Sequence, residues 1–295
     1  MGIEEIHSAL IDDLVRERGL VMLIGGPDTG KTSLAKRLLN EALRAGRRPA
    51  LVDADIGHSS VGPPACVGLK WIHGPEDLDR LNHADDLRFV GAVSPDGAVL
   101  QSVVATASLV EEARTESDLV VLDTSGTVSG VIGQTLKYHK AELCRPEMIV
   151  ALQRGGEMEP VVDMLRRFFN ARVELIGVDP SVAPISIEER RAERAKKFEE
   201  AFAPPRQRWR VQPTVFAPTL PEGLDLSRLH HMLVGLHDTS GRCRGLGVLS
   251  YEDDGLLVVA NRGEEMRGLR LGQLRLHPDT FDTESIRLRE VMFGL

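Results

Sequence analysis

The sequence has few of the features that mark secreted, metal-binding or membrane proteins. Its 295 residues include three cysteines, which are scattered without the spacing of a metal site: Cys66, Cys144 and Cys243. Such cysteines suggest reduced thiols in a cytoplasmic protein. No apolar run approaches the length that spans a bilayer, so we expect no membrane contact. The first residues have no basic segment followed by an apolar one, so we expect no signal peptide.

Positive charge is not in excess either. Lys and Arg number 36 against 44 for Asp and Glu, which gives a formal net charge of −8 at pH 7. A surface that covers duplex nucleic acid must be basic, so this composition argues against one, although a small basic pocket for one strand end is compatible with it. Nothing in the sequence indicates an obligate protein partner, and we expect a monomer.

A phosphate-binding motif is the strongest feature that is present. The segment 25–32 matches the full pattern G-x-x-x-x-G-K-[ST], between an apolar run at 20–24 and helical spacing over 31–45. This is the strand–loop–helix context that the motif needs, and it predicts binding of a nucleoside triphosphate. The alternative is a plain glycine turn. The residues expected to bind the nucleotide are Gly25, Gly26, Pro27, Asp28, Thr29, Gly30, Lys31, Thr32 and Ser33.

Three side chains are predicted to act on the phosphates and on Mg²⁺. Lys31 would reach the β- and γ-phosphates, and the Thr32 hydroxyl would be a ligand of the metal. Asp123 ends the apolar run 119–122, where nucleotide-binding folds place a second carboxylate, so we expect it to hold Mg²⁺ through water.

Two more carboxylates follow a strand predicted at 49–52. Asp53 and Asp55 alternate at its carboxyl end, where open α/β sheets place their ligands. Acids there can hold the water shell of Mg²⁺ or accept a proton from an attacking hydroxyl. The alternative is a solvated turn, because Asp is common after strands.

The hydrophobic pattern predicts an α/β fold of the P-loop NTPase type, with a mostly parallel sheet, flanking helices and a small C-terminal β-rich subdomain. We divide the chain into an N-terminal helix (1–19), a P-loop domain (20–203) and the C-terminal subdomain (204–295). Strands are expected at 87–90, 148–152, 173–178, 246–251, 255–260 and 272–276, and a helix at 158–169.

Other segments carry more specific expectations. The Gly- and Pro-rich segment 59–74 should be a loop over the site, and 204–221 a connector. A helix at 131–143 carries Lys137 and Lys140, which we expect on its solvated face. The apolar residues expected on the buried face of a helix at 97–114 are Leu100, Val103, Val104, Leu109 and Val110.

The segment 184–203 is a charged helix. Arg190 and Arg194 are four residues apart and therefore share a face. The simple interpretation is a solvated surface. The alternative is a lid, near 186–203, whose arginines close on a transferring phosphoryl group.

Together these segments resemble the polynucleotide 5′-hydroxyl kinases that include the kinase subunit of pre-mRNA cleavage factor, the nucleolar rRNA-processing kinases and stand-alone archaeal relatives. The resemblance is clearest over 25–198. His58 stands where the family usually has Gln, and Thr127 where eukaryotic members have Trp. The features that carry it are the phosphate loop, Asp53-Ala54-Asp55-Ile56-Gly57-His58 followed by Gly62-Pro63-Pro64, the segment Thr124-Ser125-Gly126, and the R-x-x-x-R pair of the charged helix.

The resemblance implies transfer of the ATP γ-phosphate, with Mg²⁺, to the 5′-hydroxyl end of RNA or DNA. Asp55 would be the general base, Asp53 its companion acid, and 124–126 a clasp that holds the lysine and the strand end. The implied residues are Lys31, Asp55, Arg190 and Arg194 for catalysis, His58, Thr124 and Gly126 for substrate binding, and Thr32, Asp53 and Asp123 for the metal.

Three other functions compete with this one. A regulatory GTPase is disfavoured because there is no Asn-Lys-x-Asp guanine motif. A nucleotide-bound scaffold without chemistry is disfavoured by the complete set of candidate catalytic residues. A kinase for a small metabolite stays open, because the sequence does not define the acceptor pocket.

Overall fold

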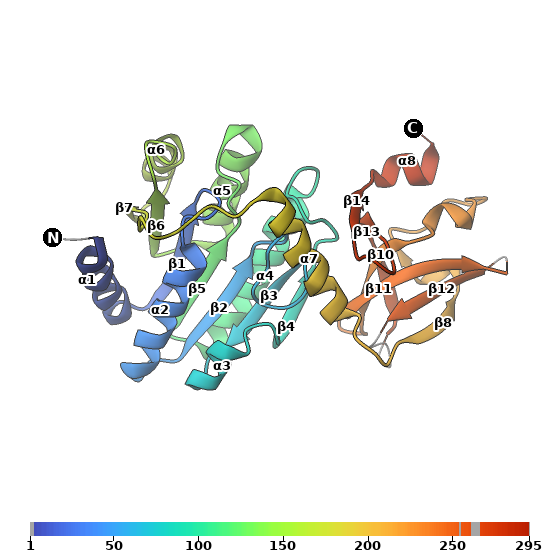
Figure 1. The fold of residues 1–295 in the computed structure, drawn as a ribbon, viewed down its shortest axis with the longest axis horizontal. Coiled ribbons are helices and arrows are strands. Elements are labelled where there is room, and N and C mark those ends of the chain that lie inside the picture. Colours follow the sequence, from blue (N-terminus) through green and yellow to red (C-terminus); the bar gives the residue numbers. More distant parts are fainter. Residues whose placement is uncertain (1–2, 254, 261–265, 295) are drawn as a thin grey trace.

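The structure is a computed structural model that describes residues 3–253, 255–260 and 266–294. These described residues form two seven-stranded sheets that are joined through helix α7 (Ile187–Ala201) (Figure 1). The first sheet carries the phosphate loop, and the second is built from the C-terminal residues. The predicted fold class, a mostly parallel α/β sheet followed by a β-rich subdomain, is confirmed. No helix in these described ranges has the length and apolar character needed to cross a membrane.

The first sheet has the strand order β4-β3-β2-β5-β1-β6-β7. The last five strands of this order are parallel, whereas β3 and β4 pair in antiparallel fashion at one edge. The carboxyl ends of β1, β2 and β5 therefore meet at the middle of one sheet edge. The strands are β1 (Gly19–Gly25), β2 (Pro49–Ala54), β3 (Cys66–Trp71), β4 (Asp86–Phe89), β5 (Leu119–Thr124), β6 (Met148–Gln153) and β7 (Arg172–Gly177).

Helices cover both faces of this sheet, which explains why its strands are continuous apolar runs. In β1, Leu20, Met22 and Ile24 pack toward α4, α5 and α6. Val21 and Leu23, on the other face, pack toward α1 and α2. The helices are α1 (Ile3–Arg16), α2 (Lys31–Arg44), α3 (Pro75–Asp79), α4 (Val99–Glu116), α5 (Gly130–Cys144) and α6 (Glu159–Phe168).

The expected buried face of α4 is partly wrong. Leu100 and Val104 are exposed, with 72% and 49% of their surface accessible. Val103, Leu109 and Val110 are buried as expected. The helix turns small residues toward the sheet beside them, because Ser102, Ala105, Thr106 and Ala113 complete its buried side.

Two segments that were expected to lack secondary structure contain strands. The segment 59–74 includes β3, and 204–221 includes β8 and β9. Gly68 belongs in β3 for a steric reason, because a Cβ atom there would lie 2.2 Å from the Val61 carbonyl oxygen. The Gly- and Pro-rich composition of 59–74 therefore reflects close backbone packing as well as loop structure.

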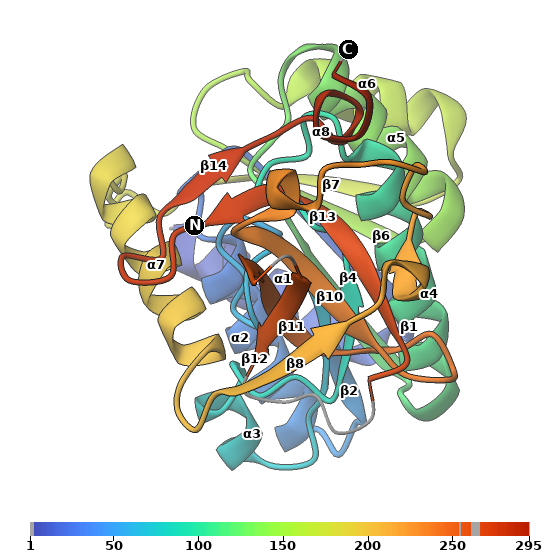
Figure 2. The same ribbon diagram turned by 90° about the vertical axis from the view of Figure 1, so that its right-hand side faces the viewer.

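The second sheet is curled and almost wholly antiparallel, with the order β14-β13-β10-β11-β12-β8 and β9 parallel to β13 (Figure 2). The predicted hairpin is confirmed, because β11 pairs with β12; Asp254 at its turn lies outside the described residues. The domain boundary at 203/204 stays a prediction. The elements are β8 (Gln207–Val211), η1 (Pro213–Val215), β9 (Phe216–Ala217), η2 (Leu226–Leu229), β10 (Met232–His237), β11 (Cys243–Glu252), β12 (Gly255–Ala260), β13 (Gly268–Leu276), β14 (Thr283–Ser285) and α8 (Leu288–Phe293).

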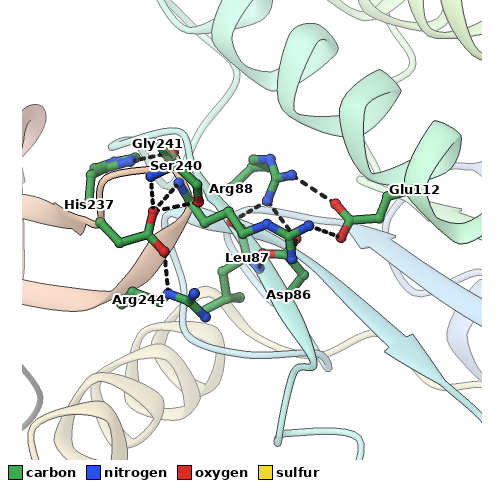
Figure 3. A network of polar contacts seen from close by, with 10 residues as sticks. Asp86, Leu87, Arg88, Glu112, His237, Ser240, Gly241 and Arg244 are labelled. Atoms are coloured by element: carbon green, nitrogen blue, oxygen red, sulfur yellow. Dashed lines mark hydrogen bonds and ion pairs between the residues drawn. The ribbon is translucent and has the colours of Figure 1, made fainter. Parts of the chain in front are cut away.

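A polar network fastens the second sheet to the first (Figure 3). Arg242, from the turn between β10 and β11, lies 3.3 Å from Asp86 and 2.8 Å from Glu112. Arg88 contacts the same two carboxylates at 2.8 and 2.9 Å. Asp86 is buried, with 4% of its side chain accessible, so two guanidinium groups share one shielded acid.

The turn that presents Arg242 is itself held by one side chain. Asp238 Oδ1 accepts hydrogen bonds from the backbone N–H groups of Ser240 (2.8 Å) and Arg242 (3.0 Å), and its Oδ2 accepts one from Arg244 Nε (2.6 Å). This local Asp turn fixes where Arg242 leaves the hairpin. The contact between the sheets therefore depends on a short segment with its own internal bonds.

We predict that Asp86→Ala lowers the free energy of unfolding by about 1–3 kcal/mol, because it leaves two arginines without their shared, buried partner. Thermal denaturation measures this. The matched control is Arg44→Ala, which breaks the exposed pair with Glu41 at 2.9 Å and should change stability by less than about 0.5 kcal/mol. Equal effects of the two variants would show that the network does not fasten the sheets.

Candidate active site

A cleft of about 600 Å³ lies at the carboxyl ends of β1, β2 and β5. This is the edge where open α/β sheets bind ligands. Its lining comes from the phosphate loop, from the segment after β2, from the segment after β5, and from the start of α7. The predicted site residues in the lining are Pro27, Asp28, Thr29, Gly30, Lys31, Thr32, Ser33, Asp55, His58, Thr124, Gly126 and Arg190.

The phosphate loop has the geometry that its glycines allow. Gly30, with φ of 82°, is in the left-handed region directly before α2. A Cβ atom at Gly25 would lie 2.7 Å from the Leu152 carbonyl oxygen. The Gly26 carbonyl accepts hydrogen bonds from Thr29 Oγ1 (3.0 Å) and Lys31 Nζ (2.7 Å). Gly25 and Gly26 therefore shape the loop, and the residues after them form its surface.

Lys31 and Thr32 lie beside the carboxylate of Asp123. The Thr32 hydroxyl donates to Asp123 Oδ2 at 2.6 Å, and Asp123 Oδ1 is buried without a hydrogen-bond partner among the described residues. Burial raises the pKa of Asp123 to about 7, with the Asp53 carboxylate adding to the effect. Burial lowers the pKa of Lys31, and the charge of Asp123 opposes this.

These groups fit Mg²⁺. A hydroxyl and an unsatisfied carboxylate oxygen side by side are hard oxygen ligands of the kind that Mg²⁺ combines with phosphate oxygens. Within the described ranges, no group of three or more His, Cys, Asp or Glu could hold a metal alone, so phosphate oxygens would have to complete the site.

Asp53 has a different environment from Asp123, although the two are register partners in adjacent strands. Its Oδ1 accepts the N–H of Asp55 at 2.9 Å, and its Oδ2 accepts the N–H and the hydroxyl of Ser60. The side chain thus closes the loop 55–61 onto the end of β2. Both oxygens of Asp53 already accept hydrogen bonds, which does not favour a metal ligand. Its predicted role as a metal ligand stays a prediction.

Of Asp53, Asp55 and Asp123, Asp55 is the one that lines the cleft. Its Oδ1 accepts hydrogen bonds from the N–H groups of Gly57 and His58, each at 3.0 Å, which fixes the carboxylate at the mouth of the loop. Beside it, His58 Nε2 is buried and has no partner among the described residues. Burial lowers the pKa of His58, so a neutral ring is favoured at this position.

The three residues of the segment 124–126 have different environments. The Thr124 hydroxyl donates to the Leu23 carbonyl at 2.7 Å and is therefore occupied within the protein. Ser125 lines the cleft, and its Oγ is buried without a hydrogen-bond partner among the described residues. Gly126 packs on the phosphate loop, because a Cβ atom there would lie 2.7 Å from Pro27 N. Ser125 was not among the predicted site residues, although its motif contained it.

The expectation for Lys137 and Lys140 is wrong. Both were expected on the solvated face of their helix, and both are fully buried on α5 below the cleft. The physical reason is that they share a stripe with Leu136, Ala141 and Cys144, which pack toward the sheet. This spacing was present in the sequence and could have placed them.

Helix α7 brings one of its two candidate arginines into the lining of the cleft. Arg190 lines it and forms an ion pair with Asp28 of the phosphate loop. Asp28 Oδ2 also accepts the N–H of Ile185 at 3.0 Å. Arg194 is partly buried and lines a neighbouring cavity of about 300 Å³ together with Arg191 and residues 281–283. Further along α7, Lys197 Nζ donates to the Ser59 carbonyl at 2.6 Å, so the helix touches both loops of the site.

Comparison with known proteins identifies relatives of this chain. A family model described as mRNA cleavage and polyadenylation factor CLP1 P-loop matches residues 25–203. A polyribonucleotide 5′-hydroxyl-kinase of Methanocaldococcus jannaschii is 35% identical over 188 residues, which cover 62% of this chain and 50% of that protein. One from Pyrococcus horikoshii is 27% identical over 326 residues and covers 90% and 88%. The polyribonucleotide 5′-hydroxyl-kinase Clp1 of Xenopus tropicalis is 29% identical, over 85% of this chain and 57% of its own length.

The solved structure of a Clp1p–Pcf11p complex has the same fold. It superposes with a TM-score of 0.71 at 13% identity and covers 92% of this chain and 79% of that one. At this identity the likeness concerns the fold alone. It extends over both sheets, because it covers nearly the whole chain.

We predict that Asp28→Asn loosens α7. The variant keeps a residue type that tolerates the φ of 52° at this position but removes the charge that pairs with Arg190. Limited proteolysis should cut within 184–203 faster than in the unchanged protein. Glu199→Gln removes an equal charge from the exposed side of the same helix and is the control. If both variants are cut at the original rate, Asp28 does not restrain the helix.

Proposed function

Because the chain belongs to the CLP1 P-loop family, we propose that it is an ATP-dependent polynucleotide 5′-hydroxyl kinase. One observation carries the proposal. A fixed carboxylate, Asp55, lines the same cleft as the phosphate loop, beside the unpartnered polar atoms of His58 and Ser125. An acceptor hydroxyl held there would have a base on one side and the γ-phosphate on the other. The named activity of several relatives, polyribonucleotide 5′-hydroxyl kinase, agrees with this arrangement.

The chemistry follows from these positions. The acceptor oxygen forms a bond to the γ-phosphorus as the bond from that phosphorus to the β-phosphate oxygen breaks, which gives ADP and a 5′-phosphate end. Asp55 accepts the proton of the attacking hydroxyl. Lys31 and Arg190 place positive charge around the transferring group.

Thr32 and Asp123 would hold Mg²⁺, which supplies charge neutralisation at the phosphate oxygens when it is bound. The donor set supports this, since one hydroxyl and one unsatisfied buried carboxylate oxygen lie together. His58, Ser125 and Gly126 would receive the strand end. We propose further that the protein acts in the cytoplasm as a monomer, without membrane contact.

The test is a side-by-side assay of labelled ATP with 5′-hydroxyl RNA, 5′-hydroxyl DNA and free nucleosides as acceptors. Label in RNA or DNA ends supports a polynucleotide kinase, and the ratio between the two gives its preference. Label only in nucleosides would indicate a small-metabolite kinase. ATP binding without transfer to any acceptor would indicate a scaffold and would overturn the proposal.

For the base, Asp55→Asn keeps the size and the two backbone hydrogen bonds but cannot accept a proton. We expect turnover to fall by about 10²-fold or more, the scale of general-base catalysis, with ATP affinity preserved. Lys31→Ala is the comparison, since it should remove transfer through the phosphates themselves. Lost ATP affinity in Asp55→Asn would instead make this carboxylate part of the metal site.

For the lid, Arg190→Ala and Arg194→Ala should each lower turnover strongly, by up to about 10³-fold, because arginines on a transferring phosphoryl group can have effects of that size. Arg191 is exposed and rotated by about 100° from Arg190, so Arg191→Ala should be milder and serves as the control. Steady-state turnover and melting temperature are measured together. Equal turnover in the three variants would show that the arginines of α7 do not act on the phosphoryl group.

A further inference from the structure

Two lysines lie completely inside the protein, directly below the candidate active site. Lys137 and Lys140 are on α5, which packs against the first sheet (Figure 1), and neither side chain is accessible to solvent. An ammonium group away from water is unfavourable unless its hydrogens and charge are satisfied. The proposed chemistry uses neither residue directly. Their contacts therefore need another explanation.

Lys137 holds the segment 124–126 from behind. Its Nζ donates to Thr124 Oγ1 at 2.9 Å and to the Ser125 carbonyl at 2.7 Å. Thr124 Oγ1 in turn donates to the carbonyl of Leu23 in β1. One ammonium group thus fixes the Thr124 hydroxyl and the backbone carbonyl of Ser125, a residue that lines the cleft. The same segment touches the phosphate loop through Gly126, so its position also affects the loop.

Lys140, one turn further along α5, holds the end of β2. Its Nζ donates to the carbonyl of Ala54 at 3.3 Å. Ala54 is the residue between Asp53 and Asp55, so this bond acts on the backbone that carries the proposed base. Burial lowers the pKa of Lys140 to about 8, and the carboxylates of Asp55 and Asp53 oppose that shift.

We propose that Lys137 and Lys140 are positioning residues of the phosphoryl-transfer site, Lys137 for the segment 124–126 and Lys140 for the strand end that carries Asp55. The inference rests on the proposed function and assigns these lysines a part in it. Each lysine extends from one helix to a different wall of the cleft. Helix α5 therefore sets the distance between the acceptor side and the base.

This role predicts a large effect on activity and a smaller one on stability. Replacing Lys137 by an apolar residue of similar length removes a charge that burial makes unfavourable, but it also takes a donor from the Thr124 hydroxyl and the Ser125 carbonyl, so the two effects on stability oppose each other. A displaced catalytic segment, by contrast, can lower turnover by about 10²-fold after a shift of about 1 Å. Replacing a residue with only a structural role would lower stability and leave turnover unchanged at temperatures well below the transition.

The experiment compares Lys137→Met and Lys140→Met in the full chain. We expect turnover with ATP and a 5′-hydroxyl oligonucleotide to fall by about 10²-fold in Lys137→Met, with a smaller change of the melting temperature than in Leu136→Ala. Affinity for ATP should change less than turnover. Leu136→Ala is the matched control, since Leu136 is buried beside Lys137 on the same helix. This variant should have a lower melting temperature, but its turnover should be unchanged at temperatures well below that transition. Turnover in both lysine variants that stays as high as in Leu136→Ala overturns the proposal.

A second variant keeps the test decisive if Lys137→Met does not fold. Thr124→Val removes the hydroxyl at the other end of the bond and should lower turnover in the same way. Where both single variants fold, the double variant should lose less than the product of the two single losses, because both changes remove one shared contact. Losses that multiply would show that Lys137 does not act through Thr124.

Hydrogen exchange separates this proposal from the proposed function. If the unchanged protein transfers phosphate to no acceptor, the kinase assignment fails, and the positioning can still be measured. Faster amide exchange confined to 124–126 in Lys137→Met, and to 54–58 in Lys140→Met, supports it. Unchanged exchange at both segments overturns it, whatever the activity.

Discussion

The candidate site depends on the burial of two carboxylates at the centre of the sheet. Asp53 and Asp123 are register partners in adjacent parallel strands, and both are almost wholly inaccessible. An ionised carboxylate away from water is costly unless it accepts hydrogen bonds or faces a positive charge. For Asp53 the loop 55–61 supplies N–H groups, which fixes that loop. For Asp123 the Thr32 hydroxyl supplies a bond and Lys31 supplies charge, which fixes the start of α2. The two acids thus join the phosphate loop to the segment that carries Asp55.

The same constraint accounts for the buried lysines of α5. The carboxylates at this edge leave negative charge in a region that water does not reach, and Lys140 places an ammonium group below the strand that carries two of them. The pKa of Asp123 is raised to about 7 and that of Lys140 is lowered to about 8, each chiefly by burial. Burial therefore disfavours both charged forms, while the mutual attraction favours them. When these carboxylates and the ammonium group are ionised, the fold holds their charges in fixed places. Such fixed charges are the condition for electrostatic stabilisation of a developing phosphoryl charge.

The sequence predicted the parts of this structure that local patterns encode. The phosphate loop was recognisable because its motif is a contiguous stretch of sequence between a strand and a helix. The parallel strands were recognisable because strands that are buried on both faces are continuous apolar runs. β3 was missed because its segment is rich in Gly and Pro, a composition that is typical of loops. At Gly68 the glycine is required by the close approach of the Val61 backbone. Lys137 and Lys140 were misplaced because residue type was given more weight than helical spacing. The pairing of Arg190 with Asp28 joins positions 162 residues apart and left no local mark.

The segment 124–126 shows how a motif can identify a site without assigning its residues. A threonine hydroxyl has one hydrogen to donate, and that of Thr124 goes to the Leu23 carbonyl, while Lys137 occupies one of its acceptor positions. Little capacity is left for a substrate. Ser125 lines the cleft and has an equivalent hydroxyl that is buried and has no partner among the described residues. A buried hydroxyl without a partner is unfavourable, and a polar ligand would remove that penalty on binding. Within this cleft, we therefore propose Ser125 rather than Thr124 as the hydroxyl residue of the motif that binds the substrate.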